Sequence, residues 1–212
     1  METITQAQLD ELCANGRAID QKSGYPAVVL HPDGSISKIW ARKKGLFSSS
    51  TLRPYAQRFV KNAQQLKARG ITVPDIIRVA RLENSHVRLV TYRGLPGTSI
   101  RELLEKTPQQ IDMQALCQYI AELHEKGILF GGMHLGNILQ MDSGFGLIDF
   151  TDVRFFRKPL TAKQRAHNLR TPLRYDEDIA RIRDAELPDL VESYLAKLPA
   201  TMADDVKREL SA

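Results

Sequence analysis

The sequence has no long apolar run and few cysteines. No apolar run approaches the roughly 20 residues that a membrane-spanning helix requires, so we expect no such helix. The first residues lack the basic and apolar segments of a signal peptide, and we expect a cytoplasmic protein. The only cysteines, Cys13 and Cys117, fit no metal or redox spacing. Cys117 lies among apolar residues, which predicts a reduced core cysteine and no disulfide.

Acidic residues are absent from the whole stretch between Asp33 and Asp75. That stretch carries nine basic residues: Lys38, Arg42, Lys43, Lys44, Arg53, Arg58, Lys61, Lys67 and Arg69. Such a run repels itself unless it is solvated or offset by an anion. Two interpretations stay open, a solvated basic face and a surface for phosphates. The second would allow nucleotide binding or peripheral contact of the 38–69 region with anionic lipid headgroups at the inner membrane. Few aromatic residues interleave with these charges, so nucleic acid is not favoured.

The first part of the chain reads as strands with two helices. Residues 5–15 predict a helix, and the alternation around the Asp33-Gly34 turn predicts a hairpin of strands 27–31 and 36–40. A basic helix from Thr51 to Arg69 follows, and then strands at 76–81 and 86–92. The Gly94–Gly97 segment breaks this pattern and predicts a hinge.

The second part reads as mostly helical. Helices are predicted at 100–106 and from Asp112 to Lys126, the latter with an apolar stripe at helical spacing. Short strands are predicted at 138–140 and 146–148, and more helices follow Thr161. Hydrophobic residues make up 42% and charged residues 26% of the chain, which is typical of a globular protein.

One dense segment carries most of the chemistry. A helix ends near Lys126, a loop holds His134 and Asn137, and Asp149 leaves the second of two short strands. We expect Asn137 and Asp149 to project from neighbouring strand ends. An amide oxygen and a carboxylate are hard ligands of the kind that Mg²⁺ takes, with phosphates and water completing the shell. Upstream, Lys38 lies on a strand among apolar neighbours, where it can neutralise phosphate oxygens.

These residues resemble the catalytic loop of kinase-like small-molecule phosphotransferases, with the pattern H-G-D-L-H-x-G-N-I-L followed by I-D-F. Lys38 resembles the strand lysine, Asn137 the metal-binding asparagine and Asp149 the aspartate of the D-F-G element. The chain resembles most the lipopolysaccharide (Kdo/heptose) kinase group and, within it, small bacterial toluene-tolerance or kinase-like proteins. The similarity runs from about Gly24 to Tyr175.

The resemblance implies an α+β, bilobal protein-kinase-like fold that binds ATP and Mg²⁺. The expected parts are an N-lobe at 1–93 with an antiparallel sheet and the basic helix, a hinge at 94–97, and a helical C-lobe at 98–212. The function implied is phosphotransfer to a sugar, a lipopolysaccharide-type molecule or another small acceptor.

Several residues depart from the pattern. Counting back from Asn137, Gly132 stands where the catalytic Asp belongs, and glycine cannot accept a proton from the substrate hydroxyl. The helix that should offer a Glu to Lys38 has no acid, and Asn62 on its inward face is the expected replacement. The glycine-rich phosphate loop is also absent, and only the Asp33-Gly34 turn stands there.

The departures leave alternatives open. His134 either orders the loop or has become the base, and Asp152 is a second candidate base or a partner of a nearby arginine. His124 is read as a packing or capping residue. Arg170 and Arg174, one helical turn apart, are interpreted either as partners of Asp176 or Asp178 or as facing an anionic substrate. The chain is therefore expected to be an atypical phosphotransferase, a pseudokinase serving as a regulatory or scaffold module in envelope stress, or a basic membrane-surface or nucleic-acid binder that has kept the fold.

Overall fold

The computed structural model describes residues 1–22, 24–41 and 54–212, with no account of the side chains of 20–22. The described chain forms two compact units. The first consists of Met1–Ala68 and Val73–Leu95, and the second of Arg69–Thr72 and Pro96–Ala212. The chain thus passes from the first unit to the second between Leu95 and Pro96, inside the segment that the sequence marks as a break. Each unit is described by itself.

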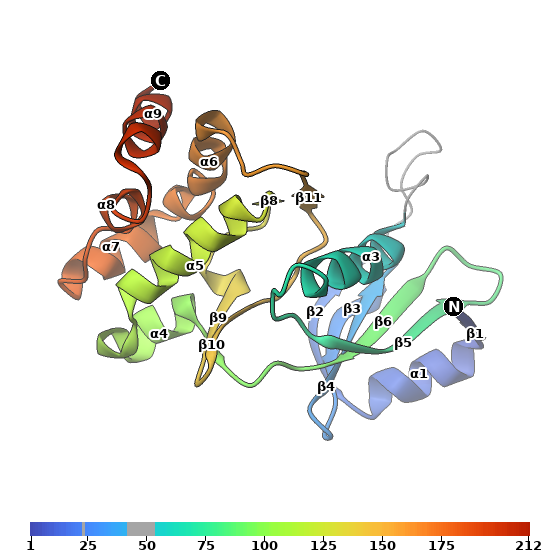
Figure 1. Ribbon diagram of the computed structural model, residues 1–212. Coiled ribbons are helices and arrows are strands. Elements are labelled where there is room, and N and C mark those ends of the chain that lie inside the picture. Colours follow the sequence, from blue (N-terminus) through green and yellow to red (C-terminus); the bar gives the residue numbers. More distant parts are fainter. Residues whose placement is uncertain (23, 42–53) are drawn as a thin grey trace. The chain divides into compact units, whose positions relative to one another are not determined.

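The first unit is built on a six-stranded sheet (Figure 1). Its strands are β1 (Glu2–Ile4), β2 (Arg17–Lys22), β3 (Tyr25–Leu30), β4 (Ser35–Trp40), β5 (Asp75–Leu82) and β6 (Arg88–Arg93). They lie in the order β1-β5-β6-β4-β3-β2. The short β1 pairs with β5 in parallel, and all the other pairs are antiparallel. Gly34 makes the β3–β4 turn with a φ of 78°, a conformation that favours glycine.

Two helices pack on the opposite faces of this sheet. Helix α1 (Gln6–Ala14) begins with a capping box at Thr5, and its Leu9 joins the core that includes Ile39 and Leu89. Helix α3 (Tyr55–Lys67) packs its Phe59 against Trp40, with ring centroids 5.9 Å apart. Because Ile39 and Trp40 are successive strand residues, their side chains point to opposite faces.

The second unit contains two small sheets and several helices. Strands β7 (Thr98–Ser99), β9 (Ile138–Met141) and β10 (Gly144–Leu147) form one sheet, and β8 (Ile128–Phe130) pairs with β11 (Val153–Phe155). Thr72 joins this unit through its carbonyl, which accepts from the Leu147 amide at 3.0 Å. The helices are α4 (Ile100–Lys106), α5 (Met113–Glu125), α6 (Ala162–Leu169), α7 (Asp176–Asp184), α8 (Leu190–Leu195) and α9 (Ala200–Ser211). Short 3₁₀ turns cover 108–110, 135–137 and 172–174.

The core of the second unit forms around α5, whose apolar stripe is buried. Asp112 caps its first turn by accepting from the Ala115 amide at 2.9 Å. Helices α6 and α9 pack on one another, and so do α5 and α8. Cys117 is fully buried in this core. Among the helices that the structure describes, none is both long and apolar enough to cross a membrane.

Most of the predicted elements are confirmed, with ends shifted by a few residues. The helix predicted at 100–106 has these bounds, and Asp112 and Thr5 act as caps. Five strands, β1, β2, β7, β8 and β11, were not predicted, because they are short or lack clear alternation. The start of the basic helix was predicted at Thr51, which lies outside the described residues. The described helix begins at Tyr55 after Pro54.

Candidate functional site

Asn137 and Asp149 lie at the adjacent ends of the β9–β10 hairpin. Within this hairpin Ile138 pairs with Leu147, and the next hydrogen bond of the ladder runs from the Ile148 amide to the Asn137 carbonyl at 3.0 Å. Asn137 therefore comes just before the first strand, and Asp149 follows the second at the same end. The hairpin brings these two predicted site residues together through local pairing alone.

The side chain of Asn137 is held in one orientation. It is 8% exposed, and its Nδ2 donates to the carbonyl of Gly132 at 2.9 Å. Its Oδ1, the atom able to bind a metal, takes no part in this bond. A carbonyl oxygen beside a carboxylate suits Mg²⁺ chemically, with the remaining ligands drawn from phosphates and water. No group of three or more His, Cys, Asp or Glu side chains in the described part of the chain could hold a metal. The pair would therefore need phosphate oxygens.

The backbone at Asp149 adopts an uncommon conformation. Its φ is 50°, in the left-handed region that non-glycine residues seldom adopt. The following side chain, Phe150, is fully buried, whereas Asp149 itself is exposed. The Thr151 hydroxyl donates to Asp149 Oδ1 at 3.3 Å. A left-handed aspartate between a buried strand and a buried Phe turns its carboxylate outward, and such strained residues cluster at functional sites.

Gly131 and Gly132, in the loop before this hairpin, differ in how much room each leaves for a side chain. An added Cβ at Gly131 would collide with the Asp152 carboxylate, whose Cγ would be 2.8 Å away. The Gly131 amide also donates to the Asp152 carbonyl at 2.8 Å. An added Cβ at Gly132 would instead lie 3.1 Å from Phe130 Cε2 and 3.4 Å from Asn137 Nδ2. The Asp152 carboxylate therefore lies against the loop at Gly131, and position 132 has nearly enough room for a side chain.

His134 lies on another side of the loop, in a cluster with Arg101 and Tyr175. Its ring centroid is 5.3 Å from that of Tyr175, and Arg101 Cζ lies 4.4 Å from the Tyr175 centroid. Asp178, with its side chain 1% exposed, accepts from Arg101 Nε at 2.9 Å and from Nη2 at 2.7 Å. His134 Nδ1 is buried without a hydrogen-bond partner.

The surroundings of His134 favour a neutral ring. Burial lowers the pKa of His134, and the charge of Arg101 lowers it further, against the opposing effect of Asp149 and Asp178. An added Cβ at Gly136 would lie 3.2 Å from His134 Nδ1 and 3.3 Å from Arg101 Nη1, so a side chain there would require the cluster to move by a few tenths of an ångström. The two candidate bases therefore lie at different places. His134, a neutral imidazole, is on the loop, and Asp152, which follows β10, lies against Gly131.

A buried polar network holds the start of the loop. Asn168 bonds both backbone groups of Phe130: Nδ2 donates to its carbonyl at 2.6 Å, and Oδ1 accepts from its amide at 3.1 Å. His124 Nε2 lies 3.2 Å from the same Oδ1, which can only accept, so Nε2 carries the proton. His124 Nδ1 then accepts from the Tyr194 hydroxyl at 2.7 Å.

Arg165 completes this network from α6, although it is only 1% exposed. It donates to the Leu160 carbonyl at 2.8 Å, to the Tyr194 hydroxyl at 3.4 Å and to Glu125 Oε1 at 2.6 Å. Burial and the charge of Arg165 lower the pKa of His124 to about 3. His124 is therefore a buried hydrogen-bonding residue rather than a helix cap.

Sequence reasoning missed Asn168, Tyr194 and Arg165. The one signal for Arg165 and Asn168 was the stretch from Arg165 to Arg170, which carries four polar residues, and Tyr194 had no signal. Arg170 Nη2 donates to the Glu209 carbonyl at 2.6 Å, and a role of Arg170 toward an anionic substrate stays a prediction. Asp178 pairs instead with Arg101, from a helix far away in sequence.

Lys38 and Asn62 belong to the first unit. Lys38 lies on β4 between the paired residues Val28 and Val90, and its Nζ is 5.8 Å from the ring centroid of Trp40. Asn62 is 8% exposed on the inward side of α3, the helix that covers this face of the sheet. Its inward position agrees with the sequence pattern, and its interaction with Lys38 stays a prediction.

The basic stretch is described only in part. Arg42, Lys43, Lys44 and Arg53 lie outside the described residues. Of the others, Lys67 pairs with Asp75, Arg58 stacks 5.4 Å from the ring centroid of its neighbour Tyr55, and Arg69 lies 4.7 Å from that of Phe155. These three cations therefore already have contacts within their own units.

Comparisons with known proteins identify the fold but no family. No protein-family model matches the chain, and no curated protein matches its sequence. A structure of the bifunctional kinase-methyltransferase WbdD is 15% identical over 87% of this chain and 47% of its own, with a TM-score of 0.49. A structure of monomeric WbdD is 13% identical over 85% of this chain and 44% of its own, with a TM-score of 0.52. The chain thus spans less than half of these structures.

At such low identity the second match shows the fold alone. The chain has an α+β, bilobal protein-kinase-like fold, with a strand-rich first unit and a mainly helical second unit. The fold class predicted from the sequence is confirmed.

Proposed function

We propose that this protein binds Mg-ATP and acts as an atypical phosphotransferase on a small acceptor. The observation that carries the proposal is that Asn137 and Asp149 lie at the same end of the β9–β10 hairpin. Asn137 is oriented by the Gly132 carbonyl, and Asp149 is turned outward by its left-handed backbone. Both donor groups suit a hard cation that also binds phosphates.

Each residue has a distinct role in this proposal. Asn137 Oδ1 and the Asp149 carboxylate hold the metal, and Lys38 binds the α- and β-phosphates. Asn62 supports Lys38 by hydrogen bonding in place of the usual glutamate. Mg²⁺, when bound, supplies neutralisation of the charge on the transferred phosphoryl group. His134 or Asp152 accepts the proton of the acceptor hydroxyl, where a loop aspartate would ordinarily do so.

The acceptor follows from the sequence resemblance to the lipopolysaccharide kinase group and its toluene-tolerance relatives. It would be a sugar or another small hydroxyl-bearing molecule, including an anionic one or a lipid headgroup. Peripheral contact of the basic 38–69 region with anionic headgroups would place the protein near such an acceptor.

Gly132 supports a second function, that of a pseudokinase. A glycine in place of the loop aspartate leaves nucleotide binding possible while removing the usual base. In this case the nucleotide would stabilise one conformation for a partner, and no phosphoryl group would be transferred.

Thermal unfolding with and without Mg-ATP tests the nucleotide site. A ligand at about 100 times its Kd stabilises the native state by about 2.7 kcal/mol, which should raise Tm by several degrees. The matched variants are Asp149→Asn and Asp152→Asn, which make the same change at two exposed aspartates three residues apart. We expect Asp149→Asn to abolish the shift with Mg-ATP and Asp152→Asn to keep it.

The remaining outcomes are equally informative. No shift for the wild-type protein at millimolar Mg-ATP would refute nucleotide binding and with it both functions. An equal loss of the shift in both variants would refute the assignment of Asp149 as a metal ligand. Where the nucleotide binds, transfer of label from γ-labelled ATP to candidate acceptors separates the phosphotransferase from the pseudokinase.

A further inference from the structure

The sheet face under α1 changes from apolar to polar along its strands. On β4 and β6, Ile39 pairs with Leu89, and both are buried in the core that includes Leu9 of α1. Two residues along, the pair is Ser37 with Thr91, and these are 0% and 9% exposed. Apolar residues at these inward positions would have enlarged the core, and buried hydroxyls are costly unless they are hydrogen-bonded.

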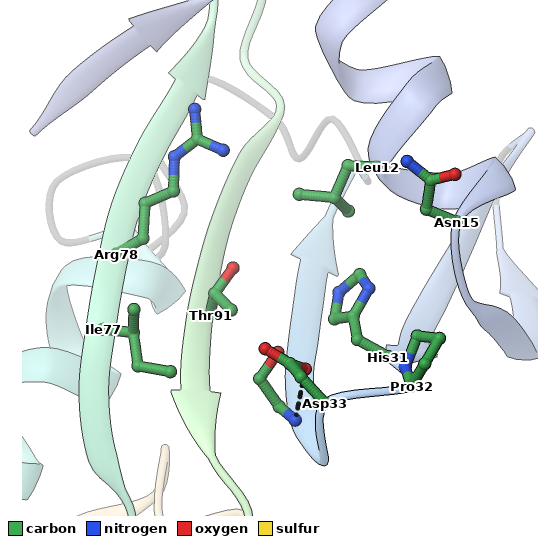
Figure 2. A pocket seen from close by; sticks show the side chains of 9 residues that line it. Leu12, Asn15, His31, Pro32, Asp33, Ile77, Arg78 and Thr91 are labelled. Atoms are coloured by element: carbon green, nitrogen blue, oxygen red, sulfur yellow. Dashed lines mark hydrogen bonds between the residues drawn. The ribbon is translucent and has the colours of Figure 1, made fainter.

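A hollow of about 550 Å³ lies over this polar half of the sheet (Figure 2). Its lining includes Leu12, His31, Asp33, Ile77, Arg78 and Thr91. Two further hollows of about 440 and 340 Å³ share Asn15 and His31 with it, so the depression continues around the end of α1. Its size falls in the range of small-molecule sites.

A chain of hydrogen bonds ends in this hollow. His31 Nε2 lies 2.8 Å from Ser37 Oγ, which lies 2.8 Å from Thr91 Oγ1. Every hydroxyl can donate or accept, and the imidazole can carry its proton on either nitrogen. The chain can therefore run in either direction, so Thr91 can accept from a ligand hydroxyl or donate to one. The His31 ring is confined, because a Cβ on Gly16 would lie 3.1 Å from its Nδ1.

The charged groups of the hollow already have partners. Arg78 donates through Nε and Nη2 to Glu2, at 2.6 and 2.8 Å. Asp33 accepts through one oxygen from the Ser35 amide and hydroxyl, at 2.9 and 2.7 Å. The lining also includes the apolar side chains of Leu12 and Ile77, and Ile77 is 55% exposed. An anionic ligand would find the Arg78 guanidinium already paired with Glu2, whereas a neutral ligand would find both hydroxyl and carbon surface in the lining.

We propose that this hollow binds an uncharged, hydroxylated molecule, a sugar or a polyol. A hydroxyl of the ligand bonds to Thr91, which is linked through Ser37 to His31. The C–H surface of the ligand packs against Leu12 and Ile77. The site lies wholly within the first unit and is separate from Asn137 and Asp149. It therefore goes beyond the proposed nucleotide site, and it is tested in the absence of nucleotide.

Ligand-observed NMR and titration of the full chain provide the test. The probes are D-glucose, D-mannose, D-galactose and myo-inositol, together with D-glucuronate and D-glucosamine as charged counterparts of one ring. We expect at least one neutral probe to bind and the charged counterparts to bind more weakly. Thr91→Val should raise Kd by up to roughly tenfold, because one hydrogen bond is lost. The control is Thr3→Val, the same change on β1 of the same sheet.

Three results would overturn the proposal. The first is that no neutral probe binds the folded wild type. The second is that Thr91→Val and Thr3→Val have equal Kd values. The third is that a charged probe binds more tightly than the neutral probes. Urea unfolding first establishes that Thr91→Val is folded. If it is not, Ile77→Asn replaces it, because that side chain is largely exposed and its loss should weaken binding without unfolding the protein. An unchanged Kd in Ile77→Asn would then overturn the proposal.

Discussion

The side-chain amide of Asn168 is bonded to both the amide and the carbonyl of Phe130, two residues before Gly132. This pair of bonds joins α6 to the strand that leads into the loop of the candidate site. It is also fully buried, since Phe130 is 0% and Asn168 2% exposed. The position of the loop therefore depends on a polar contact between segments 38 residues apart.

We expect Asn168→Ala to lower the free energy of unfolding by about 2–4 kcal/mol, because it leaves two buried donors, the Phe130 amide and His124 Nε2, without partners. Urea unfolding of the full chain measures the change. Gln118→Ala, on the exposed side of α5, is the control and should alter stability by less than about 0.5 kcal/mol. A loss no larger than that of the control would show that the Phe130 groups find other partners.

Stability should fall on acidification because of His124. Its pKa is about 3 in the folded protein and about 6.5 when unfolded, so between these values the unfolded state binds the extra proton. The contribution of neutral His124 to the free energy of unfolding is complete above pH 6.5. It is lost as pH falls toward 3, at up to about 1.4 kcal/mol per pH unit. His124→Gln should give a flatter dependence between pH 7 and 4.5, measured by urea unfolding.

The ring of His124 offers a direct check of the same prediction. In NMR spectra of the folded wild type, its nitrogen shifts should be those of a neutral imidazole protonated at Nε2, even at pH 5. A charged ring at that pH would contradict the depressed pKa, as would equal slopes for wild type and His124→Gln.

Gly132→Asp should increase phosphotransfer if the loop is otherwise competent. The new side chain needs its neighbours to move by only a few tenths of an ångström, since its Cβ would lie 3.1 Å from Phe130 Cε2. Restoring a general base should raise the rate by a factor in the range of about 10²–10⁴. Gly132→Asn, of the same size without a base, is the control. Equal rates for the two variants would refute a missing base as the cause of low activity.

Gly131→Ala should destabilise the protein through Asp152. The added methyl group overlaps the Asp152 carboxylate, and displacing it should cost about 1–3 kcal/mol. In an Asp152→Ala background the same substitution should cost clearly less, which a double-mutant cycle in urea measures. Additive effects of the two changes would show that the carboxylate moves away freely.

Local pattern predicts a large part of this fold. The helix at 100–106, the capping by Thr5 and Asp112 and the hairpin around Gly34 depend on nearby residues, so periodicity and turn chemistry suffice. The adjacency of Asn137 and Asp149 is of the same kind, because one hairpin joins them. Strands such as β8 and β11 escape prediction since three residues are too short to show an alternation.

Contacts across long sequence distances could not be predicted in this way. The Arg101–Asp178 pair joins α4 to α7, and the sequence offered Arg170 and Arg174 as nearer partners for the same carboxylate. His124, in the last turn of α5, was predicted to be a packing or capping residue, and the structure shows that it is buried against Asn168 and Tyr194. Which polar residue turns inward depends on the packing of whole helices.

The sequence alone determined the kinase-like order of Lys38, Asn137 and Asp149, and it showed that Gly132 stands where a base is expected, because motifs are read from spacing. Only the tertiary structure decided that Asp152 lies against Gly131, that Asn168 anchors Phe130 and that Thr91, hydrogen-bonded to the buried Ser37, lines a hollow. These relationships depend on how side chains from separate elements pack into the same buried space. The spacing of residues along the sequence does not specify that packing.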